Sequence, residues 1–169
     1  VLTKTNVVSR TKHVLNEMLQ SAYEKIDRHW WPARIAAGDL LRDKHNNDEN
    51  DGSMADYAAA LKINPNLPEA HVGMGEIALE NWDFEGAEKA ADEALKINSR
   101  FAPAIHLQAN KFIVERRYQQ AIETTEKALA INPRDIAALS IAAAGHACRF
   151  DEKQVKQYEE RVRAINPRC

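Results

Sequence analysis

The chain has 169 residues, of which 44% are hydrophobic and 28% are charged, and its formal net charge is −2. This balance is typical of a folded domain or a short repeat array and excludes an intrinsically disordered chain. A net charge this close to zero creates no overall field that would favour nucleic acid or an anionic membrane. The charges are unevenly placed, because residues 46–100 carry 12 acidic and 4 basic side chains. The middle of the chain is therefore strongly acidic.

Two cysteines, Cys148 and Cys169, are too few for a disulfide framework. No apolar run approaches the roughly 18 residues needed to cross a bilayer, and no signal peptide is visible at the N-terminus. The sequence starts at Val1 and ends shortly after Pro167, so we expect it to be a segment of a longer protein. These features leave the compartment undetermined, with the cytoplasm favoured.

The first predicted element is an amphipathic helix over residues 9–28. Its apolar side chains lie on one stripe at i, i+4 spacing, formed by Val14, Met18, Ala22 and Ile26.

A tripeptide recurs at a fixed interval after this helix. Ile-Asn-Pro begins at Ile63, Ile131 and Ile165, and the variant Ile-Asn-Ser begins at Ile97, so that consecutive copies stand 34 residues apart. A fixed period of this length indicates a stack of similar supersecondary units. Ile26 joins the same register once an insertion of three residues is allowed. The N-terminal helix is therefore predicted to be the second half of a truncated repeat.

Each period contains the signals of two helices. In the second full period, an apolar-periodic stretch over 68–80 is followed by a short break and a second helix over 84–97. Pro68 suits the first turn of a helix, and Asp83 is placed to cap the helix that follows it. Asn98 suits the left-handed position that ends a helix. In the other copies the next residue is proline, which disfavours helix in the residue before it.

Small and aromatic residues keep the same register as the tripeptide. The matching positions are Gly75, Phe84, Ala87 and Ala94 in one period, and Ala109, Phe112, Tyr118, Ala121, Ala128 and Pro133 in the next. These residues resemble the tetratricopeptide repeat (TPR) family, over about residues 32–167. The family pattern places a small residue in the first helix, an aromatic residue near the start of the second, two alanines within it and a proline at its end.

We predict an all-α fold, a right-handed superhelical solenoid of antiparallel helix pairs with a 34-residue period. The first full repeat departs from the pattern, because the polar run from Asn46 to Gly52 lengthens its inter-helix loop. The last repeat is divergent, with valines at two expected alanine positions, and is predicted to be truncated. The predicted units are the N-terminal helix within 1–31 and repeats over 32–67, 68–101, 102–135 and 136–169.

Sequence patterns for catalysis and metal binding are absent. Six histidines form no HExxH motif, and no CxxC, phosphate-binding glycine loop or GxSxG motif occurs. Basic residues alternate with acidic ones and form no stripe, so nucleic-acid binding is not expected. We therefore predict a non-enzymatic protein with no metal and no cofactor.

The resemblance implies that the first helices of successive repeats line a concave groove. The positions carried onto this sequence are Ile35, Asp39, Arg42 and Asp43 in the first repeat, Glu69, Val72, Glu76, Leu79 and Glu80 in the second, His106, Asn110, Ile113 and Val114 in the third, and Ser140, Ala144, Ala147 and Cys148 in the fourth. Acidic side chains dominate the first half of this set, and small apolar ones the second. The alternative, that these are only the solvated faces of amphipathic helices, stays open for each residue.

Some members of the family bind the acidic C-terminal tail of heat-shock chaperones through lysine, asparagine and arginine at groove positions. Here those positions hold Val72, Gly73, Glu76, Pro103 and Leu107, which would not attract such a tail. We predict instead that the groove binds a protein, as a peptide or helix of basic and apolar character.

Two other interpretations remain open. The array could serve as a self-association or spacer element, or as the accessory segment of an enzyme whose catalytic domain lies outside this chain.

Overall fold

The computed structural model describes Val14, residues 17–18, Ser21, residues 29–43 and residues 52–167. Within these residues the structure is helical and contains no strand. The predicted N-terminal helix and the predicted long loop fall largely outside the described residues. The helices are α2 (Trp31–Arg42), α3 (Ser53–Ile63), α4 (Pro68–Glu80), α5 (Phe84–Ile97), α6 (Ala102–Val114), α7 (Tyr118–Ile131), α8 (Ile136–Ala147) and α9 (Glu152–Ile165).

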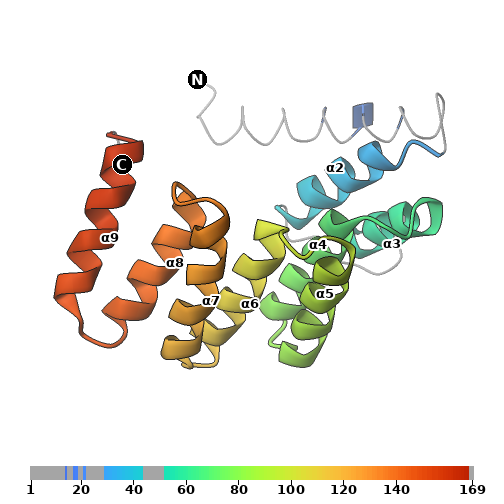
Figure 1. Ribbon diagram of the computed structural model, residues 1–169. Helices are drawn as coiled ribbons and strands as arrows, with labels where there is room; N and C mark the ends of the chain where they lie inside the picture. Colours follow the sequence, from blue (N-terminus) through green and yellow to red (C-terminus); the bar gives the residue numbers. More distant parts are fainter. Residues whose placement is uncertain (1–13, 15–16, 19–20, 22–28, 44–51, 168–169) are drawn as a thin grey trace, which may run out of the picture.

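The helices form consecutive pairs, α2–α3, α4–α5, α6–α7 and α8–α9, stacked side by side along the array (Figure 1). Each first helix also contacts the first helix of the next pair, whereas the second helices α3, α5, α7 and α9 do not contact one another through their backbones. The first helices therefore lie along the inner side of the curve. This arrangement confirms the predicted all-α solenoid of helix pairs.

The second pair shows how local sequence sets the helix bounds. The helices predicted over 68–80 and 84–97 are α4 and α5, with the same limits. The Asp83 carboxylate accepts a hydrogen bond of 2.9 Å from the backbone N–H of Gly86, as predicted for a cap. Asp151 caps α9 in the same way, through the backbone N–H of Gln154. None of the described helices is long and apolar enough to cross a membrane.

The prediction that Asn98 ends its helix in a left-handed conformation is wrong. Asn98 is extended, with φ −141° and ψ 100°, and Asn64, Asn132 and Asn166 have similar backbone angles. In Asn98 the side-chain oxygen accepts a hydrogen bond of 3.0 Å from the backbone N–H of Arg100, two residues later. This Asx turn satisfies the chain after the helix without a left-handed residue, and the extended backbone is also what a following proline requires.

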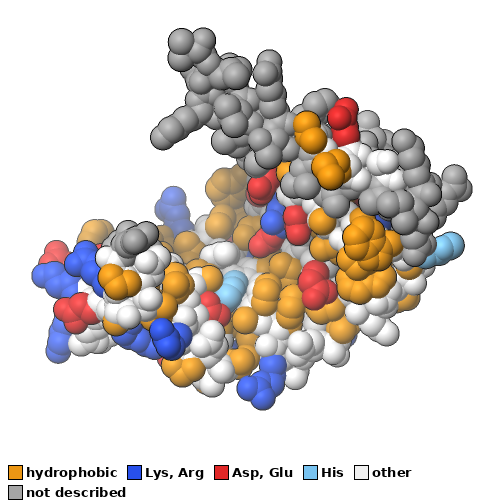
Figure 2. Space-filling view, turned by 90° about the horizontal axis from the view of Figure 1, so that it is seen from above, with side chains coloured by type: hydrophobic (Ala, Val, Ile, Leu, Met, Phe, Trp, Pro, Cys, Tyr) orange, Lys and Arg blue, Asp and Glu red, His pale blue; other side chains and the backbone are white. Residues whose placement is uncertain are grey.

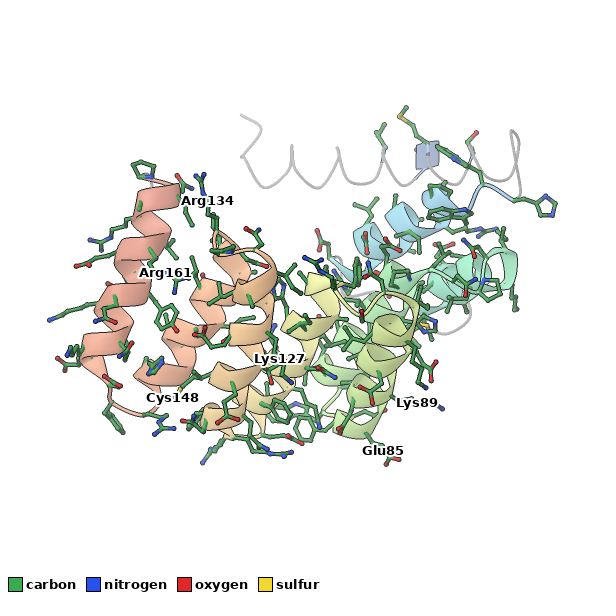
Figure 3. All side chains as sticks on the ribbon, in the orientation of Figure 1. Glu85, Lys89, Lys127, Arg134, Cys148 and Arg161 are labelled. Carbon is green, nitrogen blue, oxygen red and sulfur yellow. The ribbon has the colours of Figure 1, made fainter. Side chains whose placement is uncertain are left out.

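The left-handed residues lie instead in the turns inside each pair. Trp82, Arg116 and Phe150 stand 34 residues apart and have φ angles of 62°, 62° and 60°. All three turns lie along the lower edge of Figure 1, where Figure 3 also places Glu85, at the start of α5. Glycine is the usual residue at such a helix end, because a Cβ atom is strained there. Trp82 and Phe150 are 71% and 92% exposed, so burial of their rings offsets little of this strain.

Replacing Phe150 with glycine is expected to stabilise the fold by about 1 kcal/mol, because the left-handed backbone no longer opposes a Cβ atom. Thermal or urea unfolding followed by circular dichroism measures the difference. Phe150→Ala is the matched control, since it removes the ring and keeps the Cβ atom. An equal gain in the alanine variant would show that the exposed ring, and not the backbone, is the source of the cost.

The helices pack closely because a large side chain on one side of a junction faces a small residue on the other side. Tyr57 is fully buried, and its ring lies against the backbones of Gly38 and Gly73. A Cβ atom added at Gly38 would approach Tyr57 Cε1 to 2.7 Å. At the next junction the sizes are exchanged, because Leu107 packs on the small Ala91. The core is therefore a series of reciprocal fits between helices.

A methyl group at Gly73 is expected to cost about 1 to 3 kcal/mol of stability, because it would overlap the buried Tyr57 ring. The free energy of unfolding of Gly73→Ala checks this. The double variant Tyr57→Ala with Gly73→Leu copies the Ala91–Leu107 pair, so its loss should be smaller than the sum of the two single losses. If the loss of stability in the double variant equalled the sum of the two single losses, the two positions would not share one space, and the reciprocal fit would be contradicted.

Candidate binding groove

A cavity of about 490 Å³ opens between α2, α4 and α6, on the inner side of the array. Most of the residues that line it were predicted for the groove. The complete lining is Arg42 and Asp43 from α2 and its C-terminal end, Glu76, Leu79 and Glu80 from α4, and Leu107, Asn110 and Val114 from α6. Side chains from three different repeats therefore meet in one place.

The cavity combines an apolar floor with an acidic rim. Leu107 is 2% exposed and Leu79 is half-buried, while Val114 is exposed at the edge. Three carboxylates and one guanidinium line the same space, which leaves a net charge of −2. Arg42 forms an ion pair with Glu76, so that the first and second repeats are joined across the cavity.

One predicted groove residue is misplaced. Val72 is only 6% exposed and packs with Ala94 and Ala104 in the junction between α4, α5 and α6. The assignment to the groove is therefore corrected, because the next first helix covers this position of α4. Leu107 was considered above only as a groove position that would not attract an acidic tail, and it forms the floor of the cavity. Its place one turn before Asn110 on α6 is the sequence signal for an apolar contact there.

Asp39 lies beside the cavity and is held by a buried tyrosine. The Tyr57 hydroxyl donates a hydrogen bond of 2.7 Å to Asp39 Oδ1. Burial raises the pKa of Tyr57 well above its usual range, and the Asp39 carboxylate raises this pKa further. The same tyrosine therefore fills the junction core and fixes an acidic side chain near the groove.

Four further predicted residues are more scattered. His106 Nε2 lies 2.9 Å from Oδ2 of Asp135, the residue that caps α8, so this histidine links α6 to the start of α8. Glu69 lies in the first turn of α4, and Ile113 is partly buried. Ala144 is exposed on α8. None of these four residues lines the cavity, so they lie apart from its carboxylates, Asp43, Glu76 and Glu80.

The surface view shows the same division of charge. In Figure 2 acidic side chains gather around the central hollow, whereas basic side chains gather toward the left-hand end. Basic residues of that end include Arg149, Lys156 and Arg163, on or near α9. Among the described residues no group of three or more His, Cys, Asp or Glu side chains could hold a metal ion. Cys148, which Figure 3 places at the lower end of α8, is exposed and forms no disulfide.

Comparison with solved structures identifies the architecture. A thermophilic TPR protein from Thermus thermophilus superimposes with a TM-score of 0.71 at 16% identity, over 81% of this chain and 75% of that chain. A MamA protein gives 0.68 at 18% identity, over 99% of this chain and 97% of that one. The chain has the TPR fold. YrrB, described as a TPR protein with an unusual peptide-binding site, gives 0.59 at 14% identity, over 95% of this chain and 81% of that one.

No family model and no curated protein matches the chain. The TPR fold is thus evident from three-dimensional structure and from the register of small residues, at identities of 14–18% to the solved structures named above. At such identities side chains on the groove surface do not transfer from one TPR protein to another. The binding properties of this chain therefore depend on its own groove residues.

Replacing Tyr57 with phenylalanine is expected to remove a tyrosine whose pKa is raised by burial and by the Asp39 carboxylate. The pKa of Tyr57 is raised in the folded state above its unfolded value of about 10. Protonated Tyr57 therefore stabilises the fold fully below about pH 10, and this stabilisation is lost as the pH rises above that value toward the folded-state pKa. Ultraviolet absorbance titration of folded protein measures the step. Tyr158→Phe is the control, because burial and the neighbouring Glu126 raise the pKa of Tyr158 to about 12. If the Tyr57→Phe variant instead lost an absorbance step at about pH 10, the ordinary pKa of tyrosine, the proposed environment of Tyr57 would be contradicted.

Proposed function

We propose that this chain is a non-catalytic protein-binding module whose groove between α2, α4 and α6 holds a peptide or helix with basic and apolar side chains. The observation that carries the proposal is the cavity itself, where Asp43, Glu76 and Glu80 surround the apolar side chains of Leu79 and Leu107. An apolar ligand side chain would fill the floor, while a lysine or arginine beside it would meet the carboxylates.

The arrangement also favours positive over negative ligands. Glu76 is 41% exposed while paired with Arg42, so its carboxylate still faces solvent on one side. An acidic ligand would meet the net negative rim, and its repulsion would add to the cost of removing water from both partners. The cavity is large enough for one or two side chains, so the rest of a ligand would lie along the inner faces of the first helices.

Three synthetic peptides of equal length test this preference, with alternating Lys-Leu, Lys-Ser and Glu-Leu sequences. The Lys-Leu peptide is expected to bind at least about tenfold more tightly than either of the others. Its affinity should fall as salt is added, because exposed charges attract one another less at high ionic strength. Fluorescence anisotropy of labelled peptides measures the affinities.

The double variant Glu76→Lys with Glu80→Lys should weaken binding of the Lys-Leu peptide by at least about tenfold. A second double variant, Glu123→Lys with Glu160→Lys, makes the same change of charge at exposed positions of α7 and α9, outside the cavity. It should bind the peptide nearly as well as the unmodified chain. Equal losses in the two variants would mean that overall charge, and not the groove, holds the peptide.

A further inference from the structure

Three arginines line a hollow at the edge of the array where the helix pairs turn. The hollow has a volume of about 320 Å³, and Figure 1 shows the α6–α7 and α8–α9 turns that form it. Its complete lining is Arg116, Arg117, Tyr118, Gln119 and Gln120 from the α6–α7 turn and the start of α7, and Arg149 from the α8–α9 turn. No carboxylate lines the hollow, and none of its residues lines the groove. We call this site the arginine hollow.

Two glutamines hold two of the guanidinium groups in place. Gln120 Oε1 accepts a hydrogen bond from Arg117 Nε, and Gln119 Oε1 accepts one from Arg149 Nη1. The second bond joins the third repeat to the fourth. Because glutamine is neutral, these bonds orient the arginines without neutralising them. Each guanidinium carries more N–H donors than these bonds use, so donors remain for a ligand.

The carboxylates bonded to residues of the arginine hollow are fewer than its arginines. Glu115 lies 3.1 Å from Arg117 Nη1 and also 3.7 Å from Lys111 Nζ, so two cations share it. Glu123 accepts a hydrogen bond of 2.9 Å from the neutral Gln119. The other two arginines, at positions 116 and 149, form no ion pair within the part of the chain that the structure describes. The site therefore keeps a local excess of positive charge.

The register of the repeats shows that Arg117 does not serve the helix that it precedes. Asp83 and Asp151 stand 34 residues before and after Arg117, and each of these carboxylates caps the helix that follows it. Arg117 forms no such cap on α7, and a cation is unfavourable at the start of a helix. Its guanidinium lies instead 4.7 Å from the centre of the Phe112 ring, beside the arginine hollow. The charge at this position is thus opposite to the one that favours helix formation.

The positive charge is also confined to one repeat. Residues 116–120 carry a net charge of +2, whereas the equivalent segments 82–86 and 150–154 carry −2 and −1. A nucleic-acid strand or an anionic membrane surface would bring further negative charges against these neighbouring segments. A single anionic group is what the edge accommodates.

A phosphate monoester matches the arginine hollow better than one carboxylate does. Guanidinium groups present paired N–H donors that fit the oxygens of either anion. A phosphate monoester carries a charge of about −1.5 to −2 at pH 7 and three acceptor oxygens, so it can contact more than one arginine at once. All the lining residues except Tyr118 are exposed, so a small free molecule would stay largely in water, unlike the ligands of enclosed small-molecule sites. The hollow fits one group of a larger partner.

We propose that the arginine hollow binds a phosphorylated side chain of a partner protein. It is a second binding surface, opposite in charge to the groove and without a residue in common with it. Phosphorylation of the partner would then control attachment at this edge, independently of any ligand in the groove.

Three synthetic peptides with identical Gly-Ala flanks test the proposal, with phosphoserine, serine or aspartate at the centre. The unmodified chain should bind the phosphoserine peptide at least about tenfold more tightly than either of the others. Nuclear magnetic resonance titration of isotope-labelled chain gives the affinities, and the backbone amides of Gln119 and Gln120 should shift on binding. The proposal is overturned if the phosphoserine peptide does not bind, or binds no more tightly than the aspartate peptide.

Paired variants separate the arginine hollow from overall charge. Arg116→Gln with Arg149→Gln should weaken binding of the phosphoserine peptide by at least about tenfold. Lys89→Gln with Lys127→Gln is the matched control, because it removes the same charge at exposed positions of α5 and α7 outside the hollow (Figure 3). It should leave the affinity nearly unchanged, and equal losses in the two variants would overturn the proposal. Thermal unfolding shows that both variants are folded.

The variant Arg117→Asp provides a second check that does not depend on loss of the fold. It copies the capping aspartates of the neighbouring repeats, so α7 should remain intact by circular dichroism while binding of the phosphoserine peptide is lost. Retained binding in this variant would contradict the proposal.

Other phosphate probes distinguish the source of the anion. Inorganic phosphate should compete with the phosphoserine peptide, and failure to compete would overturn the proposal. If inorganic phosphate bound more tightly than the peptide, the hollow would be a site for the free anion and not for a partner protein. Tighter binding of phosphatidic acid vesicles or of a single-stranded oligonucleotide, lost in Arg116→Gln with Arg149→Gln, would assign the hollow to a membrane or to nucleic acid instead.

Discussion

The structure depends on a steric constraint at each junction between repeats: a large side chain on one helix requires a small one on the helix that faces it. Tyr57 fills the space left by Gly38 and Gly73, and Leu107 fills the space above Ala91. Protein interiors are packed too densely for both partners to be large. Because each junction is fitted in this way, the first helices are held at set positions, and the groove is the space that remains between them.

The groove and the junctions are built from the same helices, so their residues serve both. Leu107 belongs to a junction core and is also the floor of the cavity. Tyr57 is a core residue whose hydroxyl holds Asp39 near the rim. The Arg42–Glu76 ion pair joins two repeats and sets part of the cavity's charge. A change in the core would therefore move the charged residues of the groove, even without touching a ligand.

Two kinds of turn end the helices of the array, one between repeats and one inside them. Between repeats, asparagine in an extended conformation accepts a hydrogen bond from the second residue after it, as Asn98 does from Arg100. Inside repeats, a left-handed residue ends the first helix, and the chain places Trp82, Arg116 and Phe150 there instead of glycine. The first kind of turn is satisfied locally, whereas the second carries backbone strain that the rest of the fold tolerates.

Much of this architecture follows from the amino-acid sequence by itself. The 34-residue period, the proline in the first turn of α4 and the Asp83 cap act over a few residues, so the bounds of α4 and α5 can be predicted from them. The acidic character of the groove is also a local property, since it requires only that the first helices face inward. The tertiary structure decided which residues of those helices remain accessible. It buried Val72 under α6, joined His106 to Asp135 and made Leu107 the cavity floor. These outcomes depend on the position and angle at which the next helix pair packs. Both are set by contacts between residues distant in sequence and not by the periodicity of any one helix.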